Sequence, residues 1–464
     1  MVLMHDRPRA DDALPQIAPG GRAGARRQWA HCLLKPIRTQ LGGLCVHAKN
    51  DFVKKGNIIL LTRLFSVRRL IEGAAALLML YGQPAMAGPY TPYAVTPGEA
   101  AVGMTLDAAT VAPGSDRSAM LASIDALPTA AARADALGQL SPRSYSLLPR
   151  LSIQSMDAVD RDIRSWLVER RSVAIDAPAD IPVRGDRTIT MMLSGGIKQA
   201  SYKARIDRPE AESDSRSLRF AVDVKPVAGL IVGATLGIDG IDARLGPAQR
   251  PRISQFNSQI GSYASYSDGR FYADATAVYT LSEYKLRRQV GWAGFTGHMV
   301  APVDGDGWGA SGEAGVMLRS GAVRIQPFAG LHYRYADVSG FVENGGPAAL
   351  EVAAFRTKSL RSGLGGRISA TVMQGGWTLR PSVEAQWQRE LRSHPDSRIE
   401  ARFATRDLPI FTLRPTRLAR DAGLVNAGVS ATWNNRTTIR LGYAGEFSSD
   451  RHVHAATLTV GRRF

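Results

Sequence analysis

Cysteine is almost absent from this sequence. The 464 residues include two, Cys32 and Cys45, and none follows them. A disulfide framework and a thiol nucleophile are therefore excluded for everything after position 45. A chain that has to stay unfolded while it crosses an oxidising compartment benefits from this absence.

Long apolar runs are missing as well. No stretch of about 18 uninterrupted apolar residues occurs, which excludes a membrane protein built from helices. The mean hydropathy is −0.13. A transmembrane β-barrel passes this test, because only every second residue of its strands faces lipid.

Acidic residues are outnumbered, and the formal net charge is +17. Residues 1–87 hold 13 Lys and Arg against 5 Asp and Glu, so this short leader alone carries +8. In the remainder the arginines stand singly along alternating segments. A nucleic-acid binder gathers them in patches with aromatics. We therefore expect no nucleic-acid partner, and a solvated lumen or rim for these charges.

Residues 63–87 have the order of features of a secretory signal. Arginines precede the apolar stretch 73–81, Pro84 follows it, and Ala85 and Ala87 are the small residues that a signal peptidase needs. We predict cleavage before Gly88. Residues 1–62 are either an N-terminal extension or the product of a start assigned too early, and both alternatives stay open.

The region 88–140 is rich in Ala and Pro and is predicted to be a short stub or passenger, with short helical pieces near 118–127 and 130–140. It has too few large apolar residues for a core of its own. The region 141–182 is predicted to be a linker that contains an amphipathic helix over 151–171, about 30 Å long. Its charged residues argue against a lipid environment, so we expect a pore helix. The positions expected to pack inward or to carry charge are Met156, Val159, Asp162, Ile163, Arg164, Trp166 and Leu167.

From about residue 183 the apolar period changes to two, as in a strand with one apolar face. Residues 218–224 and 271–280 are examples, with Leu, Phe, Val, Ala and Tyr alternating against polar positions. Twelve such segments can be placed. They start near Thr188, Leu218, Leu230, Ser254, Phe271, Gly309, Val323, Leu360, Trp377, Leu424, Thr437 and His454.

The connections between these segments alternate in length. Short turns such as 225–229 and 267–270 alternate with long loops, which we expect at 196–216, 238–252, 282–308, 339–358 and 392–423. This segregation is typical of outer-membrane barrels, and an even strand count closes the sheet. We expect these side chains to face the lumen: Arg219, Asp223, Glu313, Arg334, Arg367, Arg380, Glu384 and Arg440. The predicted fold is all-β: a twelve-stranded antiparallel transmembrane β-barrel over 183–464.

Catalytic and metal-binding motifs are weak. Gly309-Ala310-Ser311-Gly312-Glu313 has Glu where the Gly-x-Ser-x-Gly motif has its last Gly. Residues 304–307, Asp-Gly-Asp-Gly, match half a calcium loop, and we interpret them as a flexible outer loop. Two histidines, His452 and His454, make at most half a metal site. We predict no enzyme activity and no cofactor.

Several stretches together resemble the autotransporter β-domains of type V secretion. The segment Pro327–Tyr333, PFAGLHY, followed by Gly340-Phe341, is similar to a family segment. The others are Ala136–Ser141 before Tyr145, Ser359–Gly365, Leu379–Pro381 with Trp387 and Glu390-Leu391, and Leu441–Tyr443 before Gly445-Glu446. The resemblance covers about 123–464.

The resemblance implies an outer-membrane translocator and anchor in a Gram-negative bacterium, with the α-helix threaded through the lumen and the N-terminal segment exported or displayed. It implies as partners the outer-membrane lipid, the barrel-assembly machinery, periplasmic chaperones and the inner-membrane secretion channel. Many members cleave themselves at an Asn pair in the pore helix, and this chain has no Asn between Asn57 and Asn257.

The last strand carries the assembly signal that the resemblance implies, a terminal Phe464 with Val460 and Leu458 on the same lipid-facing side. Two functions of other classes stay open on the residues alone: a barrel-embedded hydrolase and a passive porin-like channel. The helix favours the translocator, because a helix in the lumen has no purpose in a rim enzyme.

Overall fold

The computed structural model describes residues 90–464 apart from 177–188, 207, 247–250, 393–397 and 415–417, and these described residues belong to one compact unit. The predicted extension 1–62 and signal peptide 63–87, with Ala85 and Ala87, lie outside them. None of the described helices combines the length and the apolar character that a membrane crossing requires.

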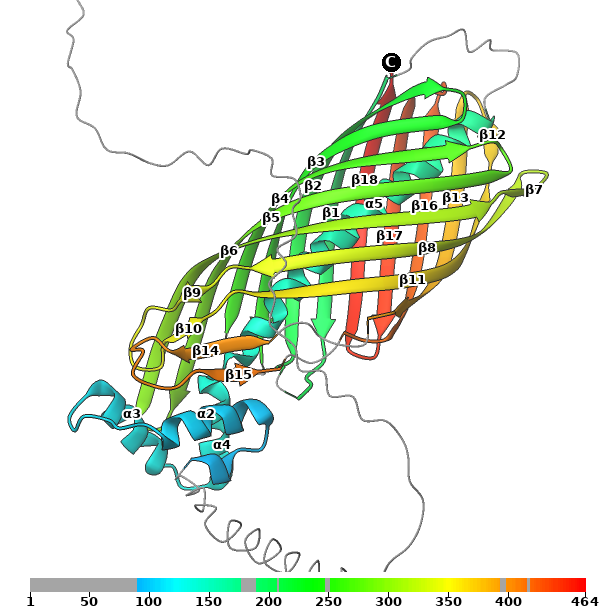
Figure 1. The fold of residues 1–464 in the computed structure, drawn as a ribbon. Helices are drawn as coiled ribbons and strands as arrows, with labels where there is room; N and C mark the ends of the chain where they lie inside the picture. Colours follow the sequence, from blue (N-terminus) through cyan, green and yellow to red (C-terminus); the bar gives the residue numbers. More distant parts are fainter. Residues whose placement is uncertain (1–89, 177–188, 207, 247–250, 393–397, 415–417) are drawn as a thin grey trace, which may run out of the picture. The chain divides into compact units, whose positions relative to one another are not determined.

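Twelve long strands form a closed antiparallel barrel, which confirms the predicted fold (Figure 1). Neighbours in sequence pair in order around the ring, and the first and last strands pair over thirteen positions, from Thr190 opposite Arg463 to Tyr202 opposite Arg451. The strands are β1 (Ile189–Tyr202), β2 (Ala211–Val227), β3 (Leu230–Leu245), β4 (Arg252–Ser267), β5 (Phe271–Trp292), β6 (Phe295–Val316), β8 (Val323–Val338), β11 (Phe355–Ala370), β13 (Trp377–Glu390), β16 (Asp421–Trp433), β17 (Thr437–Ser448) and β18 (Arg451–Arg463). Two short strands, β7 (Leu318–Ser320) and β12 (Val372–Gln374), pair with β8 and β13.

An exposed apolar belt surrounds the outer wall. On β5 it runs from Phe271 to Leu281, and the positions between these two point outward at every second residue. Ten residues span about 34 Å along a strand, or about 24 Å across a bilayer at the tilt of roughly 45° usual for such barrels. This matches the apolar band of about 25 Å that outer-membrane barrels present to lipid.

Beyond the belt, β5 and β6 continue, and on β5 the polarity of the two faces is reversed. Glu283, Lys285 and Arg287 point outward, whereas Tyr284 and Leu286 are buried inside. The predicted loop 282–308 is therefore wrong, because a connection of only two residues joins strands of 22 residues each. The prediction assumed that the outward face of every strand is apolar. Beyond the membrane, the outward face of the barrel meets water and is therefore polar.

The other predicted long loops are also shorter than expected or contain strands. The β1–β2 and β3–β4 connections begin after Tyr202 and Leu245. The predicted loops 339–358 and 392–423 contain a small four-stranded sheet. Its strands are β9 (Phe341–Val342), β10 (Leu350–Val352), β14 (Ile399–Phe403) and β15 (Phe411–Leu413), in the order β15-β14-β10-β9.

The segment 304–307 is part of β6, so the interpretation as a flexible loop is wrong. Its two glycines have a packing role. A Cβ at Gly305 would lie 2.6 Å from the Asp337 carbonyl oxygen, and one at Gly307 would lie 3.2 Å from Cε of Met156. Glycine inside a strand often marks such a close approach of another segment.

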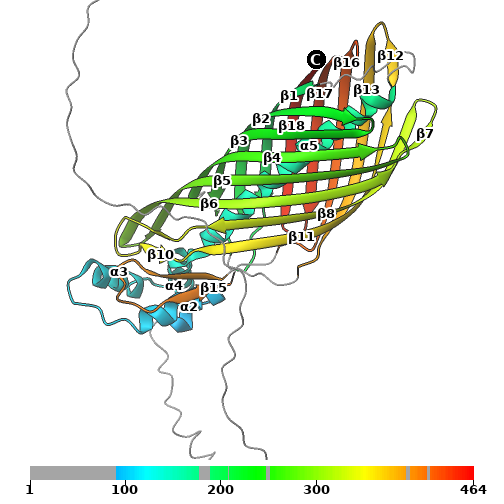
Figure 2. The same ribbon diagram turned by 45° about the horizontal axis from the view of Figure 1, so that its top comes forward.

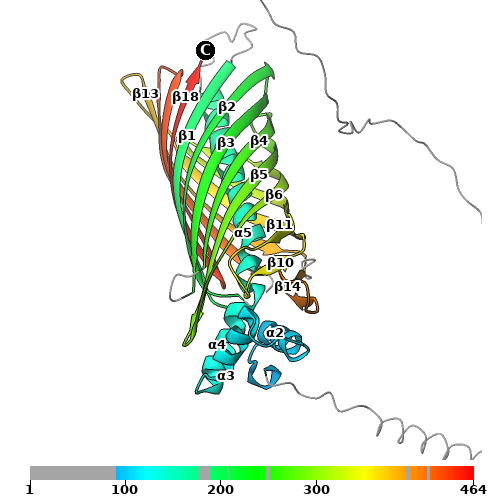
Figure 3. The same cartoon turned by 90° about the vertical axis from the view of Figure 1, so that its left-hand side faces the viewer.

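A single long helix, α5 (Leu148–Asp176), runs inside the barrel, as Figures 1 and 3 both show. It begins three residues earlier and ends five residues later than the predicted 151–171. It follows directly from the 3-10 helix η2 (Pro142–Leu147). Because the closed strands satisfy their own backbone groups, this helix meets the barrel mainly through side chains.

Three short helices lie at the end of the barrel opposite to β18's last residues (Figures 1 and 2). They are α2 (Pro97–Asp107), α3 (Asp116–Asp125) and α4 (Ala130–Leu140), preceded by the 3-10 helix η1 (Thr91–Tyr93). A capping box starts α2: the Thr96 side chain accepts from the Glu99 N–H, and the Glu99 carboxylate accepts from the Thr96 N–H. We call residues 90–147 the cap.

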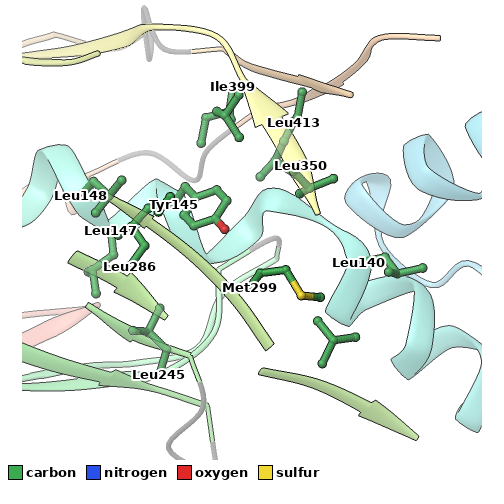
Figure 4. Close-up of a cluster of buried hydrophobic side chains, with 14 of the residues drawn as sticks. Leu140, Tyr145, Leu147, Leu148, Leu245, Leu286, Met299, Leu350, Ile399 and Leu413 are labelled. Atoms are coloured by element: carbon green, nitrogen blue, oxygen red, sulfur yellow. The ribbon is translucent and has the colours of Figure 1, made fainter. Parts of the chain in front are cut away.

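The cap has no hydrophobic core separate from the barrel. Its buried Val102, Ile124 and Leu137 belong to one cluster with the inner face of β5 and β6 and with the four-stranded sheet. Figure 4 shows Leu140, Tyr145 and Leu148 of this cluster together with residues of β10, β14 and β15. The stub region predicted to lack a core of its own is thus folded against the outer end of the barrel.

Candidate functional site: the occupied lumen

The lumen near the short turns holds a carboxylate that binds α5 twice. Asp223 of β2 accepts a hydrogen bond from Trp166 Nε1 at 2.9 Å and pairs with Arg170, whose Nη2 lies 2.9 Å from Oδ1. Arg171, the next helix residue, pairs with Asp274 and lies over the Tyr272 ring, 4.1 Å from its centroid. All these charged groups are buried. Charge-assisted bonds of this kind fix both the depth and the rotation of the helix.

At mid-lumen Arg164 joins the helix to β6. Its guanidinium lies 3.0 Å from Glu313 and 3.2 Å from Asp160, one helical turn earlier. Glu313 also accepts a hydrogen bond from the Tyr272 hydroxyl at 2.8 Å and lies 3.5 Å from Arg367. Each charge therefore has at least one opposite charge as a neighbour, which is the condition for burying it.

Three further ion pairs between the helix and the barrel follow the same pattern. Asp157 pairs with Arg334 at 3.0 Å. Asp162 lies 3.5 Å from Arg219. Glu169 of the helix pairs with Arg380 at 2.8 Å. Of the other residues expected to face the lumen, Arg367 and Glu384 are buried and pair with each other, and Arg440 is half-buried.

Apolar contacts complete the fit of the helix. Met156, Val159, Ile163, Trp166 and Leu167 are buried in one cluster with barrel residues of β1 to β5 and β8. Trp166 lies against the last strand so closely that a Cβ at Gly461 would overlap its ring. A larger residue at position 461 would therefore displace the helix.

A small cavity lies beside the helix, on the side of β1, β2, β17 and β18. Its volume is about 50 Å³, and polar and charged side chains including Asp162, Lys198, Arg219 and Arg440 line it. A space of this size holds a few water molecules. It offers no route for a folded segment, and the geometry does not favour the porin-like alternative.

Ser311, the weak nucleophile candidate, lies inside the lumen next to a histidine and an aspartate. His332 Nδ1 is 3.1 Å from Ser311 Oγ and 3.3 Å from Asp160 Oδ2, so one nitrogen faces both partners. A catalytic triad needs the serine and the carboxylate on opposite ring nitrogens. Arg334 Nη1 also donates to Ser311 Oγ at 2.8 Å. The group therefore has the geometry of a structural network.

A buried polar anchor ties the cap to the outer strands. Arg288 of β5 donates two hydrogen bonds to Glu343, of 2.9 and 2.5 Å, and one to the Gln139 carbonyl oxygen at 2.8 Å. The Tyr145 hydroxyl donates to the same carboxylate. Burial and the Glu343 charge raise the pKa of Tyr145 well above its usual value, so this hydroxyl keeps its proton and donates.

The positions expected to carry the assembly signal point away from the lumen. Leu458, Val460 and Phe464 are 53%, 42% and 66% exposed on the lipid-facing side of β18. The Phe464 N–H bonds to the Ile189 carbonyl oxygen at 2.9 Å, which continues the pairing with β1 to the last residue. His452 and His454 lie on the same outward side, and the described residues hold no group of three or more potential metal ligands.

The anchor Arg288–Glu343–Tyr145 was missed by the sequence reasoning. Both charged residues fell within predicted loops, 282–308 and 339–358. The available signal was the alternation of Tyr284, Leu286 and Val290 with charged residues, which is a strand pattern of reversed polarity.

Comparison with known proteins gives consistent matches. A family model described as "Autotransporter beta-domain" matches residues 193–444. Among solved structures, the translocator domain of the autotransporter NalP from Neisseria meningitidis is 14% identical, with a TM-score of 0.50, covering 67% of this chain and 98% of that one. The β-domain of the Bordetella autotransporter BrkA is 16% identical, with a TM-score of 0.43, covering 60% and 100%.

A curated relative extends further than this chain. An extracellular serine protease of Serratia marcescens is 25% identical over 211 residues. The match covers 45% of this chain and 20% of that relative, so the chain spans about a fifth of the protein it matches.

Proposed function

Because the chain belongs to the autotransporter β-domain family, and its barrel is a translocator of the Gram-negative outer membrane, we propose that it displays its N-terminal segment at the cell surface. The displayed part is the cap, residues 90–147. The pore helix α5 keeps it attached.

The observation that carries this proposal is the continuity of the cap with the helix in the lumen. The chain passes from α4 through η2 into α5 without a break, and α5 is held by buried ion pairs along its length. The cap in turn is bound by its shared core and by the Arg288–Glu343–Tyr145 anchor. Release of the cap would require chain cleavage and the exposure of this core.

The boundaries that belong to this proposal are a signal peptide over 63–87, a displayed region over 88–140, a linker with the pore helix over 141–182 and the barrel over 183–464. The partners are those of the export route: the inner-membrane secretion channel, periplasmic chaperones and the barrel-assembly machinery, which reads Phe464.

We propose no catalytic role for the chain. Translocator barrels are not catalytic. The Serratia relative is named a serine protease, but four-fifths of that protein lies outside the region that matches this chain. The buried Arg164 of the lumen is engaged with Asp160 and Glu313, and Arg288 at the contact with the cap is engaged with Glu343.

Surface display is tested with an epitope tag inserted at Gly114, in the connection between α2 and α3. A Cβ at Gly114 would meet no other atom within 4 Å, and the residue lies in a short turn closed by the hydrogen bond from the Ser115 N–H to the Ala112 carbonyl oxygen, outside the helices. We expect protease added to intact cells to remove the tag while the barrel stays in the outer membrane.

The matched control is the same tag inserted at Gly269, in the turn between β4 and β5 at the other end of the barrel. We expect that tag to be cleaved only after the outer membrane is permeabilised. Protection of the Gly114 tag on intact cells, together with cleavage after permeabilisation, would contradict surface display.

A further inference from the structure

The rim at the short-turn end of the barrel is strongly basic. The charged side chains that the described residues place at this rim are almost all positive. They are Lys225, Arg270, Arg319, Arg436, Arg462 and Arg463. The described hairpin turns at this end contain one acidic side chain, Asp268. Its carboxylate is occupied, because it accepts from the Arg270 and Phe271 N–H groups at 2.8 and 2.7 Å.

No carboxylate partner is found for these six cations among the described residues. Arg319 Nε donates to the Gly321 carbonyl oxygen at 3.3 Å. Arg270 and Arg462 lie over the rings of Phe271 and Phe464, 5.3 and 5.8 Å from the ring centroids. In the lumen, by contrast, Arg164, Arg170 and Arg367 each pair with a carboxylate.

The basic rim adjoins the apolar belt directly. Arg270 precedes Phe271, where the belt on β5 begins, and Arg462 lies in the lipid-facing register between Val460 and Phe464. Trp377 and Trp433 stack near the same edge, with centroids 6.2 Å apart. Aromatic rings at this level mark the lipid–water boundary. Arginine stems can follow the apolar edge while the guanidinium reaches the headgroups.

We propose that this rim binds the phosphate groups of anionic phospholipids in the inner leaflet of the outer membrane. Short turns face the periplasm in outer-membrane barrels, so the inner leaflet is the lipid at this level. Guanidinium groups bind phosphate oxygens through paired, charge-assisted hydrogen bonds. Anionic headgroups also relieve the repulsion among unpaired cations placed around one edge.

The opposite rim does not have this property. Acidic residues such as Glu212, Asp214 and Glu283 stand among its outward cations, and Arg244 pairs with Asp214 at 3.0 Å. The lipid requirement is therefore expected at one end of the barrel only. This inference concerns the barrel and does not depend on where the cap is located.

The test compares the purified chain in vesicles of phosphatidylcholine with and without one-third phosphatidylglycerol. We expect the temperature at which the barrel loses its heat-resistant electrophoretic mobility to rise by about 4 °C with the anionic lipid, because ligands that bind the folded state stabilise it. In the variant R270Q/R319Q/R436Q/R462Q, which replaces four exposed arginines, we expect at least half of this rise to disappear.

The matched control is R216Q/R252Q/K285Q/R287Q, which removes four exposed outward cations at the opposite end. It should keep the full rise. If the fourfold variant does not refold, R270Q/R319Q leaves the last strand intact and should lose a smaller share of the rise. An unchanged response in the rim variants, or an equal loss in the control, would overturn the proposal. No lipid response in the parent chain, with poor assembly of the rim variant in cells, would overturn it in favour of an acidic protein partner.

Discussion

The barrel contains two regions with opposite polarity. Within the membrane its outer face is apolar and its interior is a network of ion pairs, such as Arg164–Glu313 and Arg170–Asp223. Beyond the belt the outer face of β5 is charged, and the inner faces of β5 and β6 join the hydrophobic core that holds the cap around the buried Arg288–Glu343 pair. The same strands pass through both regions with an unbroken period of two.

The difference shows that the strand period is a property of the backbone, whereas the polarity of each face is set by its surroundings. Where lipid surrounds the barrel, the outward residues are apolar and the polar residues face the interior. Where water surrounds it, the outward residues are polar and the apolar residues face the interior. The two interiors should therefore respond to different substitutions.

The largest effect is expected in the lumen, from Arg164→Leu. The change leaves Glu313 and Asp160 buried with fewer partners, and breaking a buried ion pair costs about 3–5 kcal/mol. The free energy of unfolding in detergent, measured by urea titration, checks this. The control Arg161→Leu removes a partly exposed arginine whose distance to Glu446 is 3.5 Å. An equal loss of unfolding free energy in the two variants would show that the mid-lumen pair contributes no more than the contact of Arg161 with Glu446.

A somewhat smaller effect is expected in the outer core, from Leu350→Ala. Leu350 is fully buried, and such truncations cost about 2–5 kcal/mol. The cap should become sensitive to protease in the purified protein while the barrel keeps its heat-resistant mobility. Leu364→Ala on the lipid face, where the side chain is 58% exposed, should change the free energy of unfolding by less than about 1 kcal/mol. If both variants leave the cap protected, the cap does not depend on this core.

A change on the lipid face of the last strand, Phe464→Ala, should affect assembly more than stability. Phe464 is 66% exposed, so the folded barrel loses little packing. We expect several-fold less heat-modifiable barrel in outer membranes, because the assembly signal is weakened. Phe447→Ala, an outward aromatic on β17, should leave the amount unchanged. Unchanged levels for Phe464→Ala would refute the signal.

The smallest effect is expected at the outer surface of the four-stranded sheet and depends on pH. Hydrogen bonds from Arg402 and Arg406 lower the pKa of Glu351 to about 2. A lowered carboxyl pKa stabilises the folded state above the ordinary value near 4.5, and this contribution is lost as the pH falls from about 4.5 to 2. Protease sensitivity of residues 399–406 should rise in that interval and should be independent of pH in Glu351→Gln. Parallel profiles for the two proteins would contradict this assignment.

Much of the membrane-embedded part could be predicted. The alternation around Phe271 and Leu379 identified strands, because lipid on one side and water on the other make the two faces chemically distinct. The helix was recognisable from the spacing of Met156, Val159 and Ile163. Where the polarity of the strand faces reverses, as at Glu283, the same rule wrongly predicted a loop in place of a strand.

The functional contacts were predictable to a lesser degree. Arg164 and Glu313 could be expected in the lumen, but their pairing could not, because the rotation and depth of the helix follow from all its contacts together. The folding of the cap onto the barrel was also hidden, since Val102 and Leu137 acquire a core only when β5 and β6 extend beyond the membrane.

The sequence by itself determined the antiparallel strands, their number and the amphipathic helix, because these depend on local periods of apolar residues. The tertiary structure decided which charges pair in the lumen, how far the strands extend and where the cap packs. Those features depend on contacts between residues far apart in the chain, such as Arg170 with Asp223 and Tyr145 with Glu343, and on which solvent each strand face meets.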